Sequence, residues 1–366
     1  MANLAFILPL QFVLYQWNKN KHGDRMSQIS MAQLTSQQSL SMLTLNQWFA
    51  HNNGIFTLFD GVPNTQEGLF SIAFAGDFNA TSIDTFIQFL AHHGQTVTAL
   101  CQYQPDLGLS PALCFYTQNT TQSINPLTLK AFSETLECQL VQINTPPNLY
   151  EPGLLVMDMD STAITIECID EIARLANVYD DVASVTALAM AGKLDFSESL
   201  NQRVGKLKGI EKKLIEELKN TLPLMPGIKA LCQVLKHHNW YLAIASGGFV
   251  PFAERVQELI NLDEVHANVL EFKDDKLTGK VLGTIVDAQQ KAVILESLQA
   301  KLGLEKIQTV AIGDGANDLV MMAKAGLGVA VHGKPKVVEQ AQAAICQGSL
   351  LQLLYMLAVP LNPSQV

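Results

Sequence analysis

The chain has 366 residues, 48% of them hydrophobic, which is enough to bury a large core in two or three domains. Its formal net charge of −10 and its pI near 5.3 argue against nucleic acid or an anionic membrane as the main partner. The six cysteines form no CxxC pair and have no metal-binding spacing to histidine, a pattern typical of buried, reduced thiols. We therefore expect a cytoplasmic protein.

An apolar stretch near the N-terminus, residues 4–15, is too short to span a bilayer and is interrupted by Pro9 and Gln11. No basic residue precedes it and no small-residue cleavage pattern follows, so a signal peptide is not expected. A packed helix, a strand and a tail all fit this stretch. One or two helices are expected in residues 28–50, so that residues 1–50 would form an N-terminal extension that is helical in part.

Residues 51–148 are predicted to form an α+β domain of their own. Residues 1–150 contain only four basic and eight acidic residues, and the segment 145–148 reads Thr-Pro-Pro-Asn, as in a linker. Apolar periodicity indicates the element order βαββαβ, which is the ferredoxin-like arrangement. The expected strands are 69–75, 96–103, 112–117 and 138–143, and the expected helices are 82–92 and 126–136.

A short apolar run, residues 154–157, is predicted to be a buried strand of a parallel sheet. Asp158 and Asp160 follow it, and because alternate residues point to the same side, their carboxylates can converge on one point. Two such acids repel each other unless a cation or a shared proton lies between them. The pattern suits magnesium-dependent phosphoryl transfer, with one aspartate as nucleophile and the other as acid or base, although paired aspartates are also common in solvated loops.

The region after this strand has helical apolar spacing. Such an insert can lie over a catalytic crevice as a cap that excludes water, and we expect this cap at about residues 168–222. Its expected helices are 169–176, 180–191, 196–206 and 210–218. A later segment, 267–286, has strand-like character and is predicted to form a small hairpin with its turn at 276–279.

Two further apolar runs, 240–245 and 309–312, also end in polar residues, and a predicted helix at 288–302 carries a lysine near its start. Ligands of open α/β sheets bind beyond the carboxyl ends of the strands, so these side chains should meet at one crevice. Each pattern alone is a common turn or surface feature, but together and in this order they favour a catalytic site. The residues expected there are Asp158, Asp160, Ser246, Gly247, Lys291, Asp314, Asn317 and Asp318.

These motifs resemble those of the haloacid dehalogenase-type phosphatases. The resemblance covers about residues 154–354 and is most specific at 158–162, 246–249 and 313–318. The segment 190–196, Met-Ala-Gly-Lys-Leu-Asp-Phe, and the residues at 199–204 are similar to the cap of the phosphoserine-specific members. The resemblance implies an α/β fold in which residues 149–366 form a Rossmann-like, doubly wound parallel sheet with a helical cap, beside the ferredoxin-like domain.

The resemblance also implies a mechanism. Asp158 is the nucleophile that forms an aspartyl-phosphate, and Asp160 protonates the leaving serine oxygen and then takes a proton from the attacking water. The implied cofactor is Mg²⁺, bound by the side chains of Asp158 and Asp314 and by the main-chain carbonyl of Asp160.

The phosphate group has its own implied partners. Lys291, Ser246 and the amide of Gly247 surround the phosphoryl oxygens, and Asn317 adds a hydrogen bond. Asp318 holds a metal-bound water or orients Lys291.

The implied substrate is phosphoserine, which is hydrolysed to serine in the last step of serine biosynthesis. A selective pocket needs one opposite charge for the ammonium group and one for the carboxylate of this substrate. Glu167 would pair with the ammonium, Arg203 would bind the carboxylate with two hydrogen bonds, and Met190 would pack over the substrate. Without the resemblance, Glu167 and Arg203 read as ordinary charges on a helix surface.

Two other functions fit parts of the pattern. A related phosphatase or phosphotransferase acting on another small phosphomonoester would share the core motifs, because these do not contact the leaving group. A receiver-type signalling module also takes up phosphate on an aspartate, but it needs neither the paired Asp160 nor a long helical cap.

The role of the ferredoxin-like domain stays open. Such a module beside an amino-acid enzyme resembles regulatory domains that bind amino acids, but a fold does not carry a function. A ligand-free domain that stabilises the chain or mediates a homodimer fits equally well, because no polar cluster in 69–145 identifies a pocket.

Overall fold

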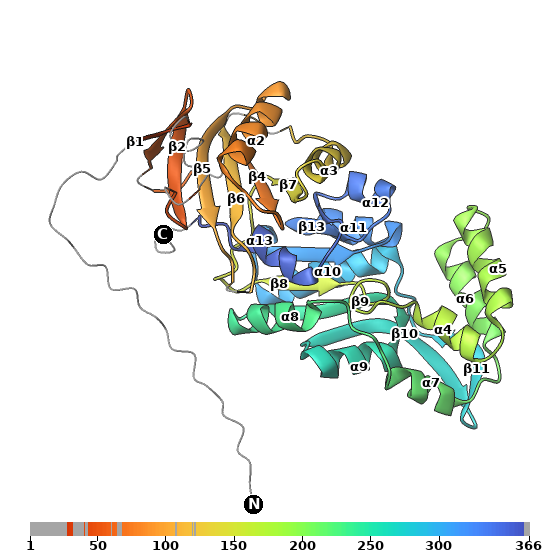
Figure 1. Ribbon diagram of the computed structural model, residues 1–366. Coiled ribbons are helices and arrows are strands. Elements are labelled where there is room, and N and C mark those ends of the chain that lie inside the picture. The colour runs from red at the N-terminus through yellow and green to blue at the C-terminus, as the bar shows by residue number, and fades with distance from the viewer. Residues whose placement is uncertain are drawn as a thin grey trace, which may run out of the picture.

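Figure 1 shows the protein as a computed structural model, which describes residues 28–361 except 32–39, 41–42, 60, 64–67, 107, 119 and 121. Most of the predicted N-terminal extension therefore lies outside the described residues. Two seven-stranded sheets organise the chain, an antiparallel one in the N-terminal part and a mainly parallel one in the C-terminal part. Within the described ranges, every helix is too short or too polar to cross a bilayer.

The antiparallel sheet contains the predicted ferredoxin-like domain. Its strands follow the order β5-β6-β4-β7, which is the order expected when two βαβ units interlock. Asn79 and Asn125 begin the two helices, and each accepts a hydrogen bond from a backbone amide of the first turn. The elements are β4 (Gly68–Phe74), α2 (Ala80–His92), β5 (Val97–Tyr103), β6 (Ala112–Gln118), α3 (Pro126–Glu134) and β7 (Gln139–Ile143).

Strands replace the expected helices at both ends of residues 28–50, although Met31 is helical and residues 32–39 and 41–42 lie outside the described residues. Gln28–Ser30 form β1 and Gln47–Asn52 form β2, which continues through a tight turn into β3 (Ile55–Leu58). The turn residues Asn53 and Gly54 have φ angles of 48° and 77°, the left-handed values that an Asn-Gly hairpin requires. Because β2 also pairs with β5, the hairpin extends the ferredoxin-like sheet across the expected boundary at residue 50.

The C-terminal sheet has the strand order β11-β10-β9-β8-β12-β13-β14, and its strands are parallel except for β11 at the edge. Strand β8 lies in the middle, between β9 and β12. The strands are β8 (Leu154–Met157), β9 (Tyr241–Phe249), β10 (Glu264–Lys273), β11 (Lys276–Leu282), β12 (Thr309–Gly313), β13 (Leu327–Val331) and β14 (Ala343–Ile345).

Helices cover both faces of this sheet, which explains why β8 has no polar residue. Leu155 and Met157 belong to the core beneath α8 and α9, whereas Leu154 and Val156 pack toward α10, α11 and α12. The predicted doubly wound α/β core is confirmed. The helices are α8 (Ile228–His237), α9 (Val250–Ile260), α10 (Ala288–Leu302), α11 (Leu319–Lys324), α12 (Pro335–Gln340) and α13 (Leu354–Leu357), with short 3-10 turns η1 (Lys306–Gln308), η2 (Ala316–Asp318) and η3 (Leu350–Leu353).

The predicted helical cap is present between β8 and α8, on the right in Figure 1. Its helices are α4 (Cys168–Leu175), α5 (Tyr179–Met190), α6 (Phe196–Lys206) and α7 (Lys212–Lys219). The hairpin beside it is also present, but its turn lies at Asp274-Asp275 and not at 276–279. Both aspartates adopt positive φ angles there, and residues 276–279 belong to β11 instead.

The ferredoxin-like domain packs on the core at the side away from cap helices α5 and α6 (Figure 1). One continuous apolar cluster contains residues of both domains. The Trp48 indole donates a hydrogen bond of 2.8 Å to the Pro360 carbonyl, and the rings of Phe74 and Tyr355 stack with centroids 4.9 Å apart. The C-terminal segment thus joins the two domains.

Trp48→Phe is expected to lower the free energy of unfolding by about 1–3 kcal/mol, because it leaves the buried Pro360 carbonyl without its partner. Urea unfolding followed by circular dichroism measures the change. Tyr150→Phe is the control, since this half-exposed side chain should contribute less than about 0.5 kcal/mol. Equal unfolding midpoints for the two variants would contradict the proposed contribution of the Trp48 hydrogen bond.

Candidate active site

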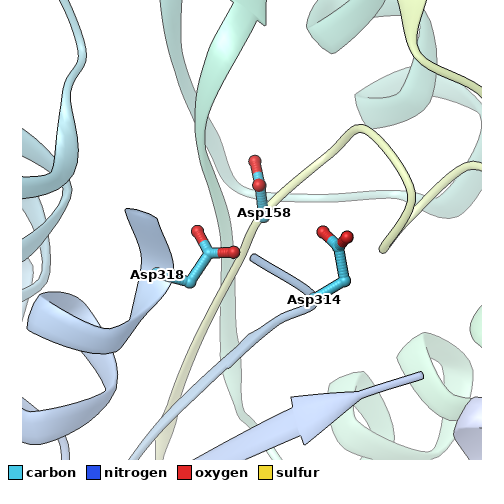
Figure 2. Close-up of side chains that lie close together, drawn as sticks. All are labelled: Asp158, Asp314 and Asp318. Atoms are coloured by element: carbon cyan, nitrogen blue, oxygen red, sulfur yellow. The ribbon is translucent and has the colours of Figure 1, made fainter. Parts of the chain in front are cut away.

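The predicted strand ends meet at one edge of the parallel sheet. The last residue of β8 pairs with Ile244 of β9 and Ile312 of β12, so the residues that follow these positions lie at one level. Asp158 follows β8, Asp314 follows β12, and Asp318 ends the short turn η2. Figure 2 shows these three carboxylates around one space. A carboxylate oxygen of each lies within 4.8 Å of the others.

Lys291, on the first turn of α10, places its ammonium group between two of these carboxylates. Its Nζ atom lies 2.8 Å from Oδ2 of Asp158 and 2.7 Å from Oδ1 of Asp318, and all three side chains are buried. Burial lowers the pKa of Lys291, but the two carboxylates outweigh it and hold the pKa above its usual range. Lys291 is therefore charged and offsets part of the negative charge at the strand ends.

Asp318 and Asp314 differ in the hydrogen bonds that their carboxylate oxygens accept. Asp318 accepts hydrogen bonds from Lys291 and, with its other oxygen, from the Gly315 amide at 3.0 Å. Asp314 accepts a long hydrogen bond of 3.4 Å from the Thr162 hydroxyl. Burial, followed by the charge of Asp158, raises the pKa of Asp314 to about 6. A cation in this space would thus stabilise the ionised form of Asp314.

Asp160 has a different environment from Asp158. Its Oδ1 atom is buried, and none of the residues that the structure describes donates a hydrogen bond to it. Burial and the nearby Glu167 carboxylate raise the pKa of Asp160 well above its usual range. A carboxyl group with a raised pKa keeps its proton to a higher pH than usual and can donate it to a leaving group.

A cavity of about 140 Å³ lies between these strand ends and the cap. Core strands and cap helices both contribute polar groups to its wall, while Lys291 and Asp318 lie behind Asp158. Eight of the predicted site residues line it: Asp158, Asp160, Glu167, Arg203, Ser246, Gly247, Asp314 and Asn317. The structure therefore brings together residues that are far apart in the sequence.

Glu167 and Arg203 give the cap side of the cavity one negative and one positive group. Glu167 accepts a hydrogen bond of 2.7 Å from the Ser161 hydroxyl, and burial raises its pKa. Burial lowers the pKa of Arg203, whose Nε atom has no hydrogen-bond partner among the described residues. Arg203 is half-buried whereas Glu167 keeps more of its surface exposed, and both still have capacity to bind a ligand.

The structure does not bring Met190 to this cavity. It is the last residue of α5, its side chain is 73% exposed, and it is not part of the cavity wall. The motif correctly predicts that this segment belongs to the cap, but a local motif does not show which of its side chains face the cavity.

The sequence did not predict that apolar residues of the cap would line the cavity. Phe196 and Leu200 of α6 and Ile169 of α4 line the cavity. A Cβ atom at Gly247 would lie 2.8 Å from the Phe196 ring, so the Gly-Gly sequence near the end of β9 makes room for this ring. That pair of glycines was the available signal for a close approach of the cap.

Comparison with known proteins agrees with this geometry. Residues 155–323 match the haloacid dehalogenase-like hydrolase family. The chain is 52% identical over 212 residues to a phosphoserine phosphatase of Vibrio cholerae, covering 58% of this chain and 65% of that protein, slightly less than two thirds of its length. It is 48% identical over 227 residues to a phosphoserine phosphatase of Haemophilus influenzae, covering 62% of this chain and 72% of that protein.

The fold similarity extends further along the chain. The crystal structure of a probable phosphoserine phosphatase from Vibrio cholerae, in unliganded form, matches with a TM-score of 0.67 and 37% identity. It covers 84% of this chain and 91% of that chain, which is more than the core and cap alone. The family resemblance seen in the motifs is confirmed. The chain belongs to the haloacid dehalogenase-like hydrolases and, within them, to the phosphoserine phosphatase family.

Proposed function

We propose that this protein hydrolyses O-phospho-L-serine to L-serine and phosphate, as in the last step of serine biosynthesis. One observation carries the proposal: Glu167 and Arg203 line the same cavity as Asp158 and Ser246. This cavity offers a carboxylate for the ammonium of the substrate, a guanidinium for its carboxylate, and a nucleophile and hydroxyl for its phosphate. The names of the two bacterial relatives support the same substrate.

Asp158 is the proposed nucleophile. An oxygen of its carboxylate forms a bond to phosphorus while the bond from phosphorus to the serine oxygen breaks. Lys291, Ser246 and the amide of Gly247 offset the negative charge on the phosphoryl oxygens, and Asn317 adds a hydrogen bond. The ammonium of Lys291 is the pre-formed part of this arrangement, since burial and its two carboxylate partners hold it in place.

Asp160 is the proposed acid and base. In the first step its proton moves to the serine oxygen, and serine leaves. In the second step it accepts a proton from water, whose oxygen attacks phosphorus and breaks the bond to Asp158. Its raised pKa, caused by burial and the charge of Glu167, supports the protonated starting form.

The acidic cluster fits a divalent cation such as Mg²⁺. Hard cations prefer oxygen ligands, and carboxylate oxygens of Asp158, Asp314 and Asp318 gather within 4.8 Å. Asp158 and Asp314 would hold the ion with their side chains and Asp160 with its main-chain carbonyl, whereas both oxygens of Asp318 already accept hydrogen bonds. A bound Mg²⁺ supplies charge neutralisation and orientation to the phosphoryl group.

The remaining assignments concern the whole chain. We infer a division into an N-terminal extension, expected at 1–50 but ending before β2, a ferredoxin-like domain that includes β2 and runs to 148, and a phosphatase unit at 149–366 that includes the cap. The ferredoxin-like domain is proposed either to mediate a homodimer or to bind an amino-acid ligand. Free thiols on all six cysteines support a cytoplasmic protein. The net charge of −10 supports the proposal that neither nucleic acid nor an anionic membrane is its main partner.

Arg203→Ala and Glu167→Gln are expected to lower kcat/KM for phosphoserine about 30-fold or more, because losing one partner of a desolvated charge pair costs about 2–5 kcal/mol. Turnover of p-nitrophenyl phosphate should change less than about threefold, since this ester has no ammonium or carboxylate. Arg174→Ala, a solvent-facing arginine of the cap, is the control. Equal losses on both esters would reduce the assignment to a phosphatase for some other small phosphomonoester.

Asp158→Asn is expected to abolish both turnover and the retention of labelled phosphate on the protein after rapid denaturation, because an amide oxygen is a poor nucleophile. Asp160→Asn should still label, but more slowly and with slower release, since it lacks a transferable proton. Asp181→Asn, on the exposed face of the cap, should behave as wild type. Labelling of the Asp158→Asn protein would assign the nucleophile to another residue.

Asp314→Asn is expected to stabilise the metal-free protein at pH 8 while inactivating it. The folded-state pKa of about 6 lies above the usual carboxyl value of about 3.9, so ionised Asp314 costs stability above pH 6, and this cost disappears as the pH falls toward 4. For this partly exposed group the gain should be on the order of 1–2 kcal/mol at pH 8 and near zero at pH 4.

Chemical unfolding with excess chelator measures that difference, and Asp181→Asn is again the control for loss of one charge. A gain of the same size at both pH values would show that the charge of Asp314 is not its cause.

A further inference from the structure

Asn268, on β10, is a buried amide that bonds to two separate segments of the proposed phosphate site. Its Nδ2 atom donates to the Gly247 carbonyl at 2.8 Å, and its Oδ1 atom accepts from the Val286 amide at 2.9 Å. The side chain is fully buried. Val286 directly precedes Asp287, the residue that caps α10 and thereby begins the helix that carries Lys291.

The pairing between β9 and β10 explains why the Gly247 carbonyl needs this partner. Ala245 pairs with His266, and the next pair joins Phe249 to Asn268, so residues 246–248 of β9 face a single residue of β10. The extra residues make β9 bulge where it reaches the cavity. A partly buried carbonyl outside the regular ladder is best paired by a side chain or a water, and the fully buried Asn268 supplies the side chain.

The peptide group between Gly247 and Gly248 is held at both ends. Its carbonyl accepts from Asn268, and its N–H donates to Oγ of Ser246 at 2.9 Å. A peptide group is planar, so fixing its carbonyl also fixes the direction of its N–H. Because the Ser246 oxygen accepts this N–H, its own hydrogen is left to be donated to an oxygen in the cavity.

We propose that Asn268 is a positioning residue of the phosphate site. It holds the Gly247–Gly248 peptide, and through it the Ser246 hydroxyl, at a fixed separation from the start of α10 and therefore from Lys291. Asn268 itself is not part of the cavity wall. The inference rests on the proposed function only in that the cavity binds a phosphate group. An amide suits the task because it offers one donor and one acceptor in a single side chain.

The test is Asn268→Leu, which keeps the number and branching of the side-chain non-hydrogen atoms and removes both hydrogen bonds. Its control is Gln142→Leu in the ferredoxin-like domain, where a buried amide also bonds at both ends, to Ser71 and Gln95 through Nε2 and to the Ile124 amide through Oε1. Thermal unfolding of both variants shows the structural cost of losing a buried amide. Titration calorimetry with inorganic phosphate and kcat/KM on two esters report on the site.

Asn268→Leu should weaken inorganic phosphate binding about tenfold or more and lower kcat/KM by about 10- to 100-fold on phosphoserine and p-nitrophenyl phosphate alike, because misplaced binding groups lose catalysis steeply. Gln142→Leu should leave phosphate affinity and kcat/KM within twofold of wild type, even if its melting temperature falls as much as that of Asn268→Leu. Rates on the two esters should fall together, since both present the same phosphate.

A folded Asn268→Leu protein with phosphate affinity within twofold of wild type overturns the proposal, as does a loss confined to phosphoserine. If Asn268→Leu does not fold, the smaller Asn268→Ala decides in the same way, because its methyl group can neither donate to the Gly247 carbonyl nor accept from the Val286 amide. If the wild-type protein binds phosphate but hydrolyses neither ester, the proposed function is refuted. The role of Asn268 is still tested in that case, by comparing the phosphate affinities of the wild type and the variants.

Discussion

Charge compensation around Lys291 is the interaction on which the arrangement of the site depends. Parallel strands deliver Asp158 and Asp314 to one sheet edge, with Asp318 one short turn further along, and their carboxylates would repel one another in a buried space. The ammonium of Lys291, bonded to Asp158 and Asp318, lowers that repulsion, and a buried charge is tolerated only when it is paired in this way. Burial and the charge of Asp158 raise the pKa of Asp314, and because its oxygens are largely free of hydrogen bonds from the described residues, a cation fits beside it.

The same cavity combines two kinds of chemistry from two parts of the chain. The strand ends supply groups for a phosphate, and these would serve any phosphomonoester. The cap supplies Glu167 and Arg203, whose opposite charges are complementary to the ammonium and carboxylate groups that amino acids share. Phe196 closes the gap above Gly247, so the cap also limits access of water to the reacting groups. Under the proposed function, selectivity and catalysis would be carried by different elements of the chain and would be separable by mutation.

The ferredoxin-like domain is joined firmly to the core but is remote from the cavity. Its apolar residues continue into the core cluster. Trp48 and Phe74 of this domain contact Pro360 and Tyr355 of the C-terminal segment. The cavity wall consists of residues between Asp158 and Asn317, without any from this domain in the part of the chain that the structure describes. Any influence of this domain on catalysis would have to be transmitted through the packed core. Because the apolar interface between the two domains is continuous, each domain also stabilises the other.

Much of this protein follows from local sequence patterns. Uninterrupted apolar runs with polar residues directly after them predicted β8, β9 and β12 and the residues at their ends, because both features arise within a few neighbouring residues. The cap helices and the ferredoxin-like order followed from periodicity in the same way. Contacts between distant segments decided the rest. Strand β2 exists because β5 pairs with it, Met190 faces solvent although its segment belongs to the cap, and Asn268 meets Gly247 only through the bulge of β9. The sequence therefore determined the elements and most of the chemical groups, whereas tertiary packing decided which side chains face the cavity, because that choice depends on residues that are neighbours only in space.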